Sequence, residues 1–213
     1  IAGYTVYADL VKPYFPDKEY LTTPMTKEET RCRMAFECCM EGKDTAMICS
    51  GDSGVYGMAG LMYEVGVNYP EVELEIVPGV TAALGGAAVL GAPLIHDFCL
   101  ISLSDLLTPW EKIEARLLGA SQADFVICLY NPSSKKRHDY LQKACDLMMQ
   151  YKSPDTVCGT VCNIGREGEE YHLMTLKELR DTQVDMFTTV FIGNSQTKEI
   201  NGKMVTPRGY RNV

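Results

Sequence analysis

The stretch Ile48-Cys49-Ser50-Gly51-Asp52-Ser53-Gly54-Val55-Tyr56-Gly57 decides the fold class of this chain. Thr45 to Cys49 is short and apolar, which is typical of a buried strand. The strand breaks at Ser50-Gly51-Asp52, and a helical pattern follows from about Val55 to Val65. Such a glycine turn lets a ligand approach the backbone at the sheet edge where open α/β folds bind ligands. An ordinary strand-to-helix turn has the same pattern, and both interpretations indicate an α/β fold.

A second turn of the same kind follows. Leu74 to Val77 is a candidate strand, and it leads into Pro78-Gly79-Val80-Thr81-Ala82-Ala83 and a helix of very small residues from Ala82 to Leu90. Small residues allow a helix to pack closely on a sheet. They also leave room beside the turn for a ligand, so a packing role and a binding role both remain open.

Strands and helices alternate along the rest of the chain, which supports an α/β fold with some antiparallel pairing near the end. Thr26 and Glu29 have capping-box spacing, so a helix should begin there and run to about Met40, ending near Gly42. Gly91-Ala92-Pro93 should break the small-residue helix, and a domain boundary near residue 97 divides the chain into 1–97 and 98–213.

The second half contains seven further predicted elements. They are a strand from Phe98 to Leu103, a helix from Pro109 to near Gly119, a strand from Asp124 to Tyr130, a helix from Ser134 to about Tyr151, a strand from Thr156 to Ile164, a helix from Leu176 to Arg180 and a strand from Thr188 to Gly193. Lys198 to Val205 reads as a hairpin around Asn201-Gly202, a strong type I′ turn signal.

Composition limits the function classes. The chain has 213 residues, a net charge of −8 and a pI of about 4.9, which disfavours nucleic-acid binding. No apolar run has the roughly 18 residues that suggest a membrane span. Nine cysteines without a Cys-x-x-Cys pair fit reduced thiols in a cytoplasmic protein, and we expect no metal site.

Taken together, the two glycine turns carry a resemblance. Ser-Gly-Asp-x-x-Val-Tyr-Gly at 50–57, followed by Val-Pro-Gly-Val-Thr-Ala-Ala at 77–83, is similar to the tetrapyrrole methylase family. Four further segments extend the resemblance over nearly the whole chain: Ile101 to Trp110, Cys128 to Lys135, Phe191 to Ser195 and Thr206 to Tyr210. The resemblance implies two α/β domains, the first with a mainly parallel sheet and the second with a mixed sheet.

The resemblance also implies an activity. It is the transfer of a methyl group from S-adenosylmethionine, bound between the two domains, to ring carbon 17 of precorrin-3B or its cobalt form, with ring contraction, in cobalamin biosynthesis. Family members are homodimers. They normally carry a Gly-x-Gly-Pro-Gly loop that lines the cofactor site, and no such loop occurs from Ile1 onward. We therefore expect a fragment, with reduced activity and stability.

The family pattern assigns the cofactor contacts. Methyl transfer from a sulfonium is an in-line displacement whose leaving thioether needs no proton, so the protein's main task is alignment, which main-chain turns can perform. The assigned residues are Ser50, Gly51, Asp52, Val55, Tyr56, Thr81, Ala82, Tyr130, Asn131 and Gly165. Asp52 either binds a cofactor hydroxyl or amine or caps the next helix.

The substrate implied by the family carries many carboxylates, so an acidic protein must concentrate positive charge locally. Ser134, Lys135, Lys136 and Arg137 lie where a strand ends and a helix should begin, which suits a carboxylate trap. A solvated basic turn is the alternative.

Ring contraction benefits from proton transfer, and the candidate catalytic residues are Asp105, Ser104 and Tyr130. Asp105 also suits a helix cap or turn.

Three other functions remain as alternatives. A sister methylase acting on another ring carbon would share most of these motifs. A nucleotide-binding oxidoreductase would need a Gly-x-Gly-x-x-Gly turn, which the sequence lacks. A tetrapyrrole carrier or an inactive fragment would bind the macrocycle without transferring a methyl group.

Overall fold

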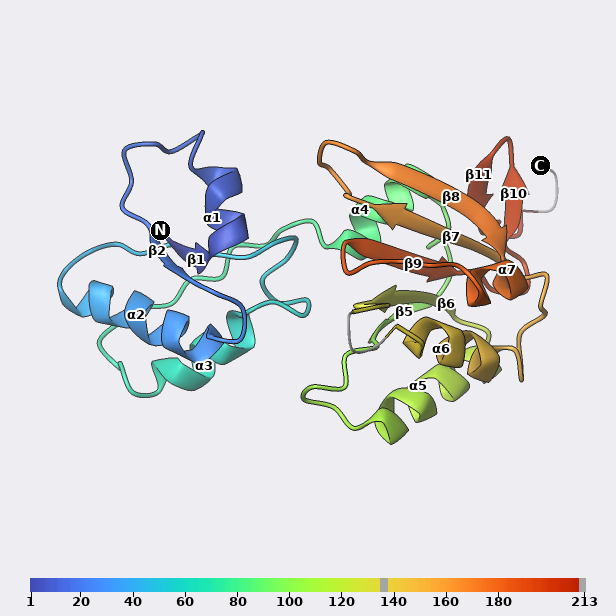
Figure 1. Cartoon of the computed structure of the whole chain (residues 1–213), viewed down its shortest axis with the longest axis horizontal. Coiled ribbons are helices and arrows are strands. Elements are labelled where there is room, and N and C mark those ends of the chain that lie inside the picture. Colours follow the sequence, from blue (N-terminus) through green and yellow to red (C-terminus); the bar gives the residue numbers. More distant parts are fainter. Residues whose placement is uncertain (135–137, 211–213) are drawn as a thin grey trace. The chain divides into compact units, whose positions relative to one another are not determined.

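The structure is a computed structural model that describes residues 1–134 and 138–210, and its chain divides into two compact units, Ile1–Thr81 and Ala82–Val213 (Figure 1). The boundary between the units falls where the small-residue helix begins. The domain boundary expected near residue 97 stays a prediction.

The first unit is built on a small parallel sheet, as predicted. Strand β1 (Ala2–Tyr4) lies between β2 (Leu21–Thr23) and β3 (Met47–Ile48), and both neighbours are parallel to it. Three helices accompany the sheet: α1 (Thr5–Val11), α2 (Glu28–Met40) and α3 (Ala59–Gly66). Helices α2 and α3 bury Phe36 and Met62 in one cluster with Ala2 of β1, which makes the core of this unit.

Two local predictions for the first unit need correction. Helix α2 ends at Met40 as expected, but its N-cap is Lys27 without a side-chain bond, and the Glu28 carboxylate accepts the Thr26 amide at 3.1 Å. The predicted capping box is therefore wrong. Helix α3 begins at Ala59 rather than Val55, because the chain turns first, with the Ala59 amide bonded to the Ser53 carbonyl at 3.0 Å.

The predicted strand at Leu74 to Val77 is also wrong, because these residues pair with no strand of the described chain. Val77 is 71% exposed, so the apolar run that suggested a strand is not buried. Strand β3 is only two residues long and pairs with β1 alone, so it provides no neighbour for this segment.

The second unit contains a five-stranded mixed sheet, as predicted. Its order is β5-β6-β9-β7-β8, in which β5 is parallel to β6 and the other pairs are antiparallel. The strands are β5 (Phe98–Ser102), β6 (Val126–Tyr130), β7 (Val157–Cys162), β8 (Glu170–Thr175) and β9 (Thr188–Ile192). Strand β8 was not predicted from the sequence, and its first three residues are exposed.

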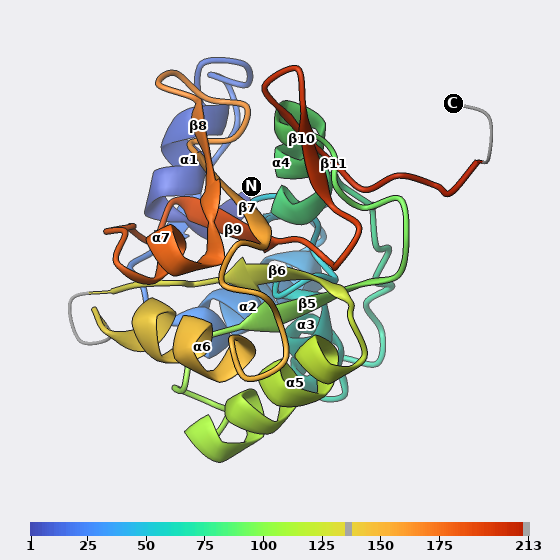
Figure 2. The same cartoon turned by 90° about the vertical axis from the view of Figure 1, so that its right-hand side faces the viewer.

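Helices cover both faces of this sheet. On one face α5 (Trp110–Gln122), α6 (Tyr140–Met148) and α7 (Leu176–Arg180) share a core with Ile127 and Leu129 of β6, and on the other face α4 (Ala82–Leu90) packs with Cys128 (Figure 2). The alternation follows from the two-residue period of a strand. Helix α7 has the predicted bounds, whereas α6 begins at Tyr140 and not at Ser134.

A hairpin is the last regular element of the described chain. Strands β10 (Lys198–Ile200) and β11 (Lys203–Val205) are antiparallel, and β11 pairs in parallel with β4 (Gly91–Ala92) next to α4 (Figure 2). Asn201 and Gly202 both have positive φ, at 52° and 73°, which confirms the predicted turn. No helix in the described ranges is long and apolar enough to cross a membrane.

Candidate functional site

The two glycine bends of the first unit are joined by one carboxylate. Asp52 accepts the Gly54 amide at 2.8 Å through Oδ1 and the Gly79 amide at 2.9 Å through Oδ2. The amides of Gly79 and then Gly54 hold the pKa of the Asp52 carboxyl below its usual range, since they stabilise the ionised form. Asp52 does not cap α3, whose N-cap is Met58, so it is a clamp between two loops.

The bends lie so close together that one of them requires glycine. A Cβ on Gly79 would overlap the Gly51 carbonyl oxygen and come within 3.4 Å of the Asp52 Cα. Backbone atoms cannot move aside as a flexible side chain can. The sequence therefore permits this approach only because residue 79 lacks a side chain.

A groove of about 720 Å³ borders these bends within the first unit. Gly51, Ser53 and Gly79 line it, as do Met47 of β3 and the segment from Glu71 to Pro78. Four carboxylates and one lysine also line it: Asp44, Glu71, Glu73, Glu75 and Lys43. Its volume is in the usual range for a small-molecule site, and its excess of negative charge favours a cationic ligand over a polycarboxylate.

The residues at the bends fit a ligand that is bound mainly through the backbone. Gly51 is exposed with φ at 73°. The Ser53 hydroxyl is buried and has no hydrogen-bond partner among the described residues. Buried hydroxyls are nearly always paired, so an unpaired one beside a groove is a suitable contact for a bound ligand. Nothing in the sequence indicated Ser53 beyond its place in the motif.

A polar cluster lies at the carboxyl ends of β5 and β6 in the second unit. These strands are parallel and in register at Ser102 and Tyr130, so the residues that follow them emerge at the same edge. Ser102 Oγ accepts the Asn131 side-chain amide at 2.9 Å and the Ser104 backbone amide at 3.2 Å. Asn131 has φ at 52°, in the left-handed region that asparagine adopts more readily than most other residues.

The same cluster extends to Asp105 and Tyr140. Tyr140 Oη donates a hydrogen bond to Asp105 Oδ2 at 2.7 Å, and both residues are half-buried. Asp105 is not the cap of α5, whose N-cap is Pro109 without a side-chain bond. Tyr140 was not predicted from the sequence, because it lies 35 residues from Asp105 and no spacing rule connects them.

Tyr130 joins this edge of the sheet to helix α4. Its hydroxyl accepts the Ala83 amide at 2.8 Å, next to the predicted contact Ala82 at the start of the helix. Gly165 lies in the turn after β7 with φ at 69°, and its amide bonds Glu169 at 2.7 Å. Thr81 is buried and is the last residue of the first unit.

Among the predicted cofactor residues, the structure thus joins Gly51 and Asp52 to the Gly79 bend in the first unit, where Ser50, Val55 and Tyr56 lie in the same loop. In the second unit it brings Asn131 and Ser104 together on Ser102 Oγ, beside Tyr130, whose hydroxyl bonds the residue after Ala82. Ser134 is half-buried and outside α6, while Lys135, Lys136 and Arg137 lie outside the described residues. The substrate trap therefore stays a prediction.

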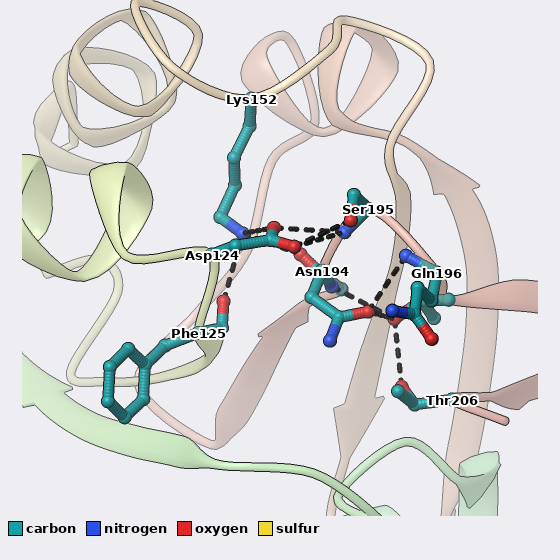
Figure 3. A network of polar contacts seen from close by, with 9 residues as sticks. Asp124, Phe125, Lys152, Asn194, Ser195, Gln196 and Thr206 are labelled. Carbon is teal, nitrogen blue, oxygen red and sulfur yellow. Dashed lines mark hydrogen bonds and ion pairs between the residues drawn. The ribbon is translucent and has the colours of Figure 1, made fainter. Parts of the chain in front are cut away.

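A second polar network lies at the opposite end of β6. The Lys152 side chain is 2% exposed, and its ammonium donates to the carbonyls of Phe125 and Gly193 at 2.9 Å and contacts Asp124 Oδ1 at 3.5 Å (Figure 3). Asp124 in turn accepts the Ser195 hydroxyl at 2.6 Å. Because the network precedes β6 and follows β9, it joins connecting loops away from the cluster described above.

The pKa values of this pair reflect burial. Burial lowers the pKa of Lys152, and the Asp124 carboxylate only partly offsets this effect. Burial acts to raise the pKa of Asp124, but the Ser195 hydrogen bonds and the lysine outweigh it, so the pKa is lowered. The buried ammonium is thus held by carbonyls as well as by one carboxylate, which indicates a structural role.

Comparisons with known proteins place this architecture in one class. The family described as Tetrapyrrole (Corrin/Porphyrin) Methylases matches residues 1–180. A solved structure described as the methyltransferase CobJ superposes with a TM-score of 0.86 at 33% identity, covering 97% of this chain and 87% of that one. This two-unit α/β chain belongs to the tetrapyrrole methylase family.

Similar relatives carry a more specific name. A Salmonella typhimurium protein named probable cobalt-factor III C(17)-methyltransferase is 48% identical over 99% of this chain and 88% of its own length. A Priestia megaterium protein named cobalt-factor III methyltransferase is 44% identical over 99% of this chain, which spans 40% of that protein.

Proposed function

We propose that this chain is an S-adenosylmethionine-dependent methyltransferase that methylates ring carbon 17 of a cobalt-bearing factor III macrocycle, with ring contraction, in cobalamin biosynthesis. The observation that carries the proposal is the 48% identity over 99% of the chain to a relative named for this activity. The segment from Ile101 to Trp110, which contains Asp105, favours this enzyme over a sister methylase acting on another ring carbon.

The first unit suits the methyl donor. S-adenosylmethionine supplies a methyl group on a positively charged sulfur. Gly51 and Gly79 would hold it through the backbone, with the Ser53 hydroxyl as a further contact, and Asp52 keeps the two bends together. The acidic groove attracts a sulfonium and repels the carboxylates of the macrocycle. The resemblance adds Thr81, Ala82, Tyr130, Asn131 and Gly165.

The carboxyl ends of β5 and β6 in the second unit suit the macrocycle. Asp105 and Ser104 would exchange protons with its substituents, while Tyr130 and Asn131 hold the ends of the loops. Ser134, Lys135, Lys136 and Arg137 would bind its carboxylates. Leu106 and Leu107 are 74% and 98% exposed, and such exposed leucines suit the apolar body of a large ring. The enzyme would act in the cytoplasm as a homodimer.

Two measurements test the proposal. Titration calorimetry should detect S-adenosylhomocysteine binding, and incubation with S-adenosylmethionine and cobalt-factor III should give a product heavier by one methyl group with the absorption spectrum of a contracted ring. A methylated product with an uncontracted ring would support the sister-methylase alternative instead. Absence of S-adenosylhomocysteine binding would leave only a carrier or an inactive fragment.

The metal preference is tested in the same assay. Parallel incubations with metal-free precorrin-3B should be slower than those with cobalt-factor III. Equal or faster turnover of the metal-free substrate would overturn the cobalt assignment and leave the C(17) assignment in place.

A further inference from the structure

We infer that Tyr140 is a positioning residue for this reaction, which holds the carboxylate of Asp105 in place at the carboxyl ends of β5 and β6. The inference rests on the proposed function. It adds a residue that lies outside the motifs by which the family resemblance was drawn.

The contact itself is short and specific. Tyr140 Oη donates to Asp105 Oδ2 at 2.7 Å. A hydroxyl that donates to an ionised carboxylate makes a charge-assisted hydrogen bond, stronger than a neutral one. The bond anchors one oxygen of Asp105, so the carboxyl group loses freedom to rotate.

The tyrosine ring is held independently of its hydroxyl. It packs against Trp110, with ring centroids 4.6 Å apart, and Lys143 Nζ lies 5.2 Å from its centroid. Lys143 is held in turn by Asp139 at 2.7 Å. These contacts involve the ring faces and edges rather than Oη, so removing the hydroxyl should leave the ring in place.

The position of the pair separates it from an ordinary surface contact. Asp105 is the third residue after β5 and follows Ser104, whose amide donates to Ser102 Oγ. The next two residues, Leu106 and Leu107, project into solvent. A carboxylate fixed beside exposed apolar side chains, at the edge of parallel strands where open sheets bind ligands, is suited to a large apolar substrate with polar substituents.

The chemistry asked of the pair is one proton transfer. The Asp105 carboxylate would take one proton from a substituent of the macrocycle and later release it to water, with no change of oxidation state. Tyr140 keeps its proton and its hydrogen bond throughout. Because small misplacements of a reacting group cost up to about 100-fold in rate, loss of this bond should lower turnover.

The test compares Tyr140→Phe with wild type in the full chain. We expect kcat for the contracted product to fall about tenfold to 100-fold, with KM for the macrocycle, affinity for S-adenosylhomocysteine and the urea unfolding midpoint all unchanged. Tyr171→Phe is the matched control, because Tyr171 lies in β8, the edge strand on the far side of the same sheet, and its hydroxyl donates to the Gly202 carbonyl. It should leave kcat unchanged.

A double-variant cycle shows whether Tyr140 acts through Asp105. In single-turnover measurements, adding Tyr140→Phe to Asp105→Asn should cause no further loss, because the amide that replaces the carboxylate cannot take the proton, whether or not Tyr140 still holds it. If Asp105→Asn has no measurable turnover, the inference is tested by Tyr140→Phe alone. A lower kcat with an unchanged KM supports it.

Two results would overturn the inference. One is wild-type kcat in Tyr140→Phe, and the other is a loss that multiplies fully with that of Asp105→Asn. An inactive wild-type chain would instead contradict the proposed function, so the two failures are distinguishable.

Discussion

Asp52 shows how one side chain can organise a site built from backbone. It accepts amides from both glycine bends, so replacing it with Asn removes the charge and leaves one amide facing a donor. We expect Asp52→Asn to weaken S-adenosylhomocysteine binding about tenfold, measured by calorimetry. Asp44→Asn, an exposed change on the groove rim, should weaken it less. If both variants lost the same affinity, the effect would come from the lost negative charge and not from the hydrogen bonds between the two bends.

The lowered pKa of Asp52 gives this contribution a pH dependence. A carboxyl whose pKa is lower when folded than when unfolded adds stability above the unfolded value of about 3.9, and that stability is lost as pH falls through the folded value. The difference in unfolding free energy between wild type and Asp52→Asn should therefore shrink as pH falls from 6 to 3. A difference that stays constant would contradict the clamp.

Lys152 is expected to matter for stability and not for catalysis. Lys152→Met keeps an unbranched side chain of similar volume but leaves the carbonyls of Phe125 and Gly193 without their donor (Figure 3). We expect a loss of about 2–3 kcal/mol in the unfolding free energy from urea titration. The exposed Lys177→Met should change it by less than about 0.5 kcal/mol. A similar loss in both variants would show that the buried hydrogen bonds of Lys152 do not stabilise the folded state.

Among the elements, α4 most clearly shows why small residues occur in the sequence. A Cβ on Gly86 would lie 2.8 Å from Phe191 Cζ and 3.0 Å from Ile164 Cδ1, and Phe191 is fully buried. Gly86→Ala should therefore destabilise the protein by about 1–3 kcal/mol despite the better helix propensity of alanine. Chemical denaturation measures this value.

Gly119→Ala in α5 is the matched control, because a Cβ there meets nothing within 4 Å. The same substitution should stabilise the protein by about 0.5–1 kcal/mol through helix propensity alone. If both variants moved in the same direction, tight packing of α4 on the sheet would not be the reason for Gly86.

The elements that the sequence predicted well are those whose own residues carry the signal. Helix α4 has the expected bounds, and the Asn201-Gly202 turn forms the predicted hairpin, because both depend on local backbone preferences. Leu74 to Val77 failed because a strand also needs a partner, and β3 does not provide one. Strand pairing depends on residues far away in the sequence.

In the candidate site, too, the features with a local sequence signal could be predicted and those that depend on distant contacts could not. The first glycine bend could be predicted, because a strand followed by Ser-Gly-Asp is a local pattern, whereas the Asp52 bond to Gly79 spans 27 residues and could not. Tyr140 and Ser53 were missed because their significance lies in a distant contact and in a missing partner. A local sequence pattern shows neither a contact between distant residues nor the lack of a hydrogen-bond partner.

At the scale of the whole chain, the two compact units make ligand binding a test of the proposed site. Each unit has a core of its own, with Phe36 buried in the first and Phe191 in the second. The cofactor contacts implied by the resemblance fall in both units, from Ser50 to Thr81 and from Ala82 to Gly165. Under the proposed function, each set of contacts would stabilise the unit that contains it.

We therefore expect S-adenosylhomocysteine at 100 times its dissociation constant to stabilise the chain by about 2.7 kcal/mol. For a chain of this length, that raises the melting temperature by about 5–10 °C. Calorimetric melting should show the whole transition moving, or both transitions where two are resolved. Asp52→Asn at the same ligand concentration should show a smaller shift because it binds more weakly. A shift confined to one of two transitions would mean that a single unit holds the cofactor. Either the glycine bends of the first unit or the residues after β5 and β6 in the second unit would then not belong to the cofactor site.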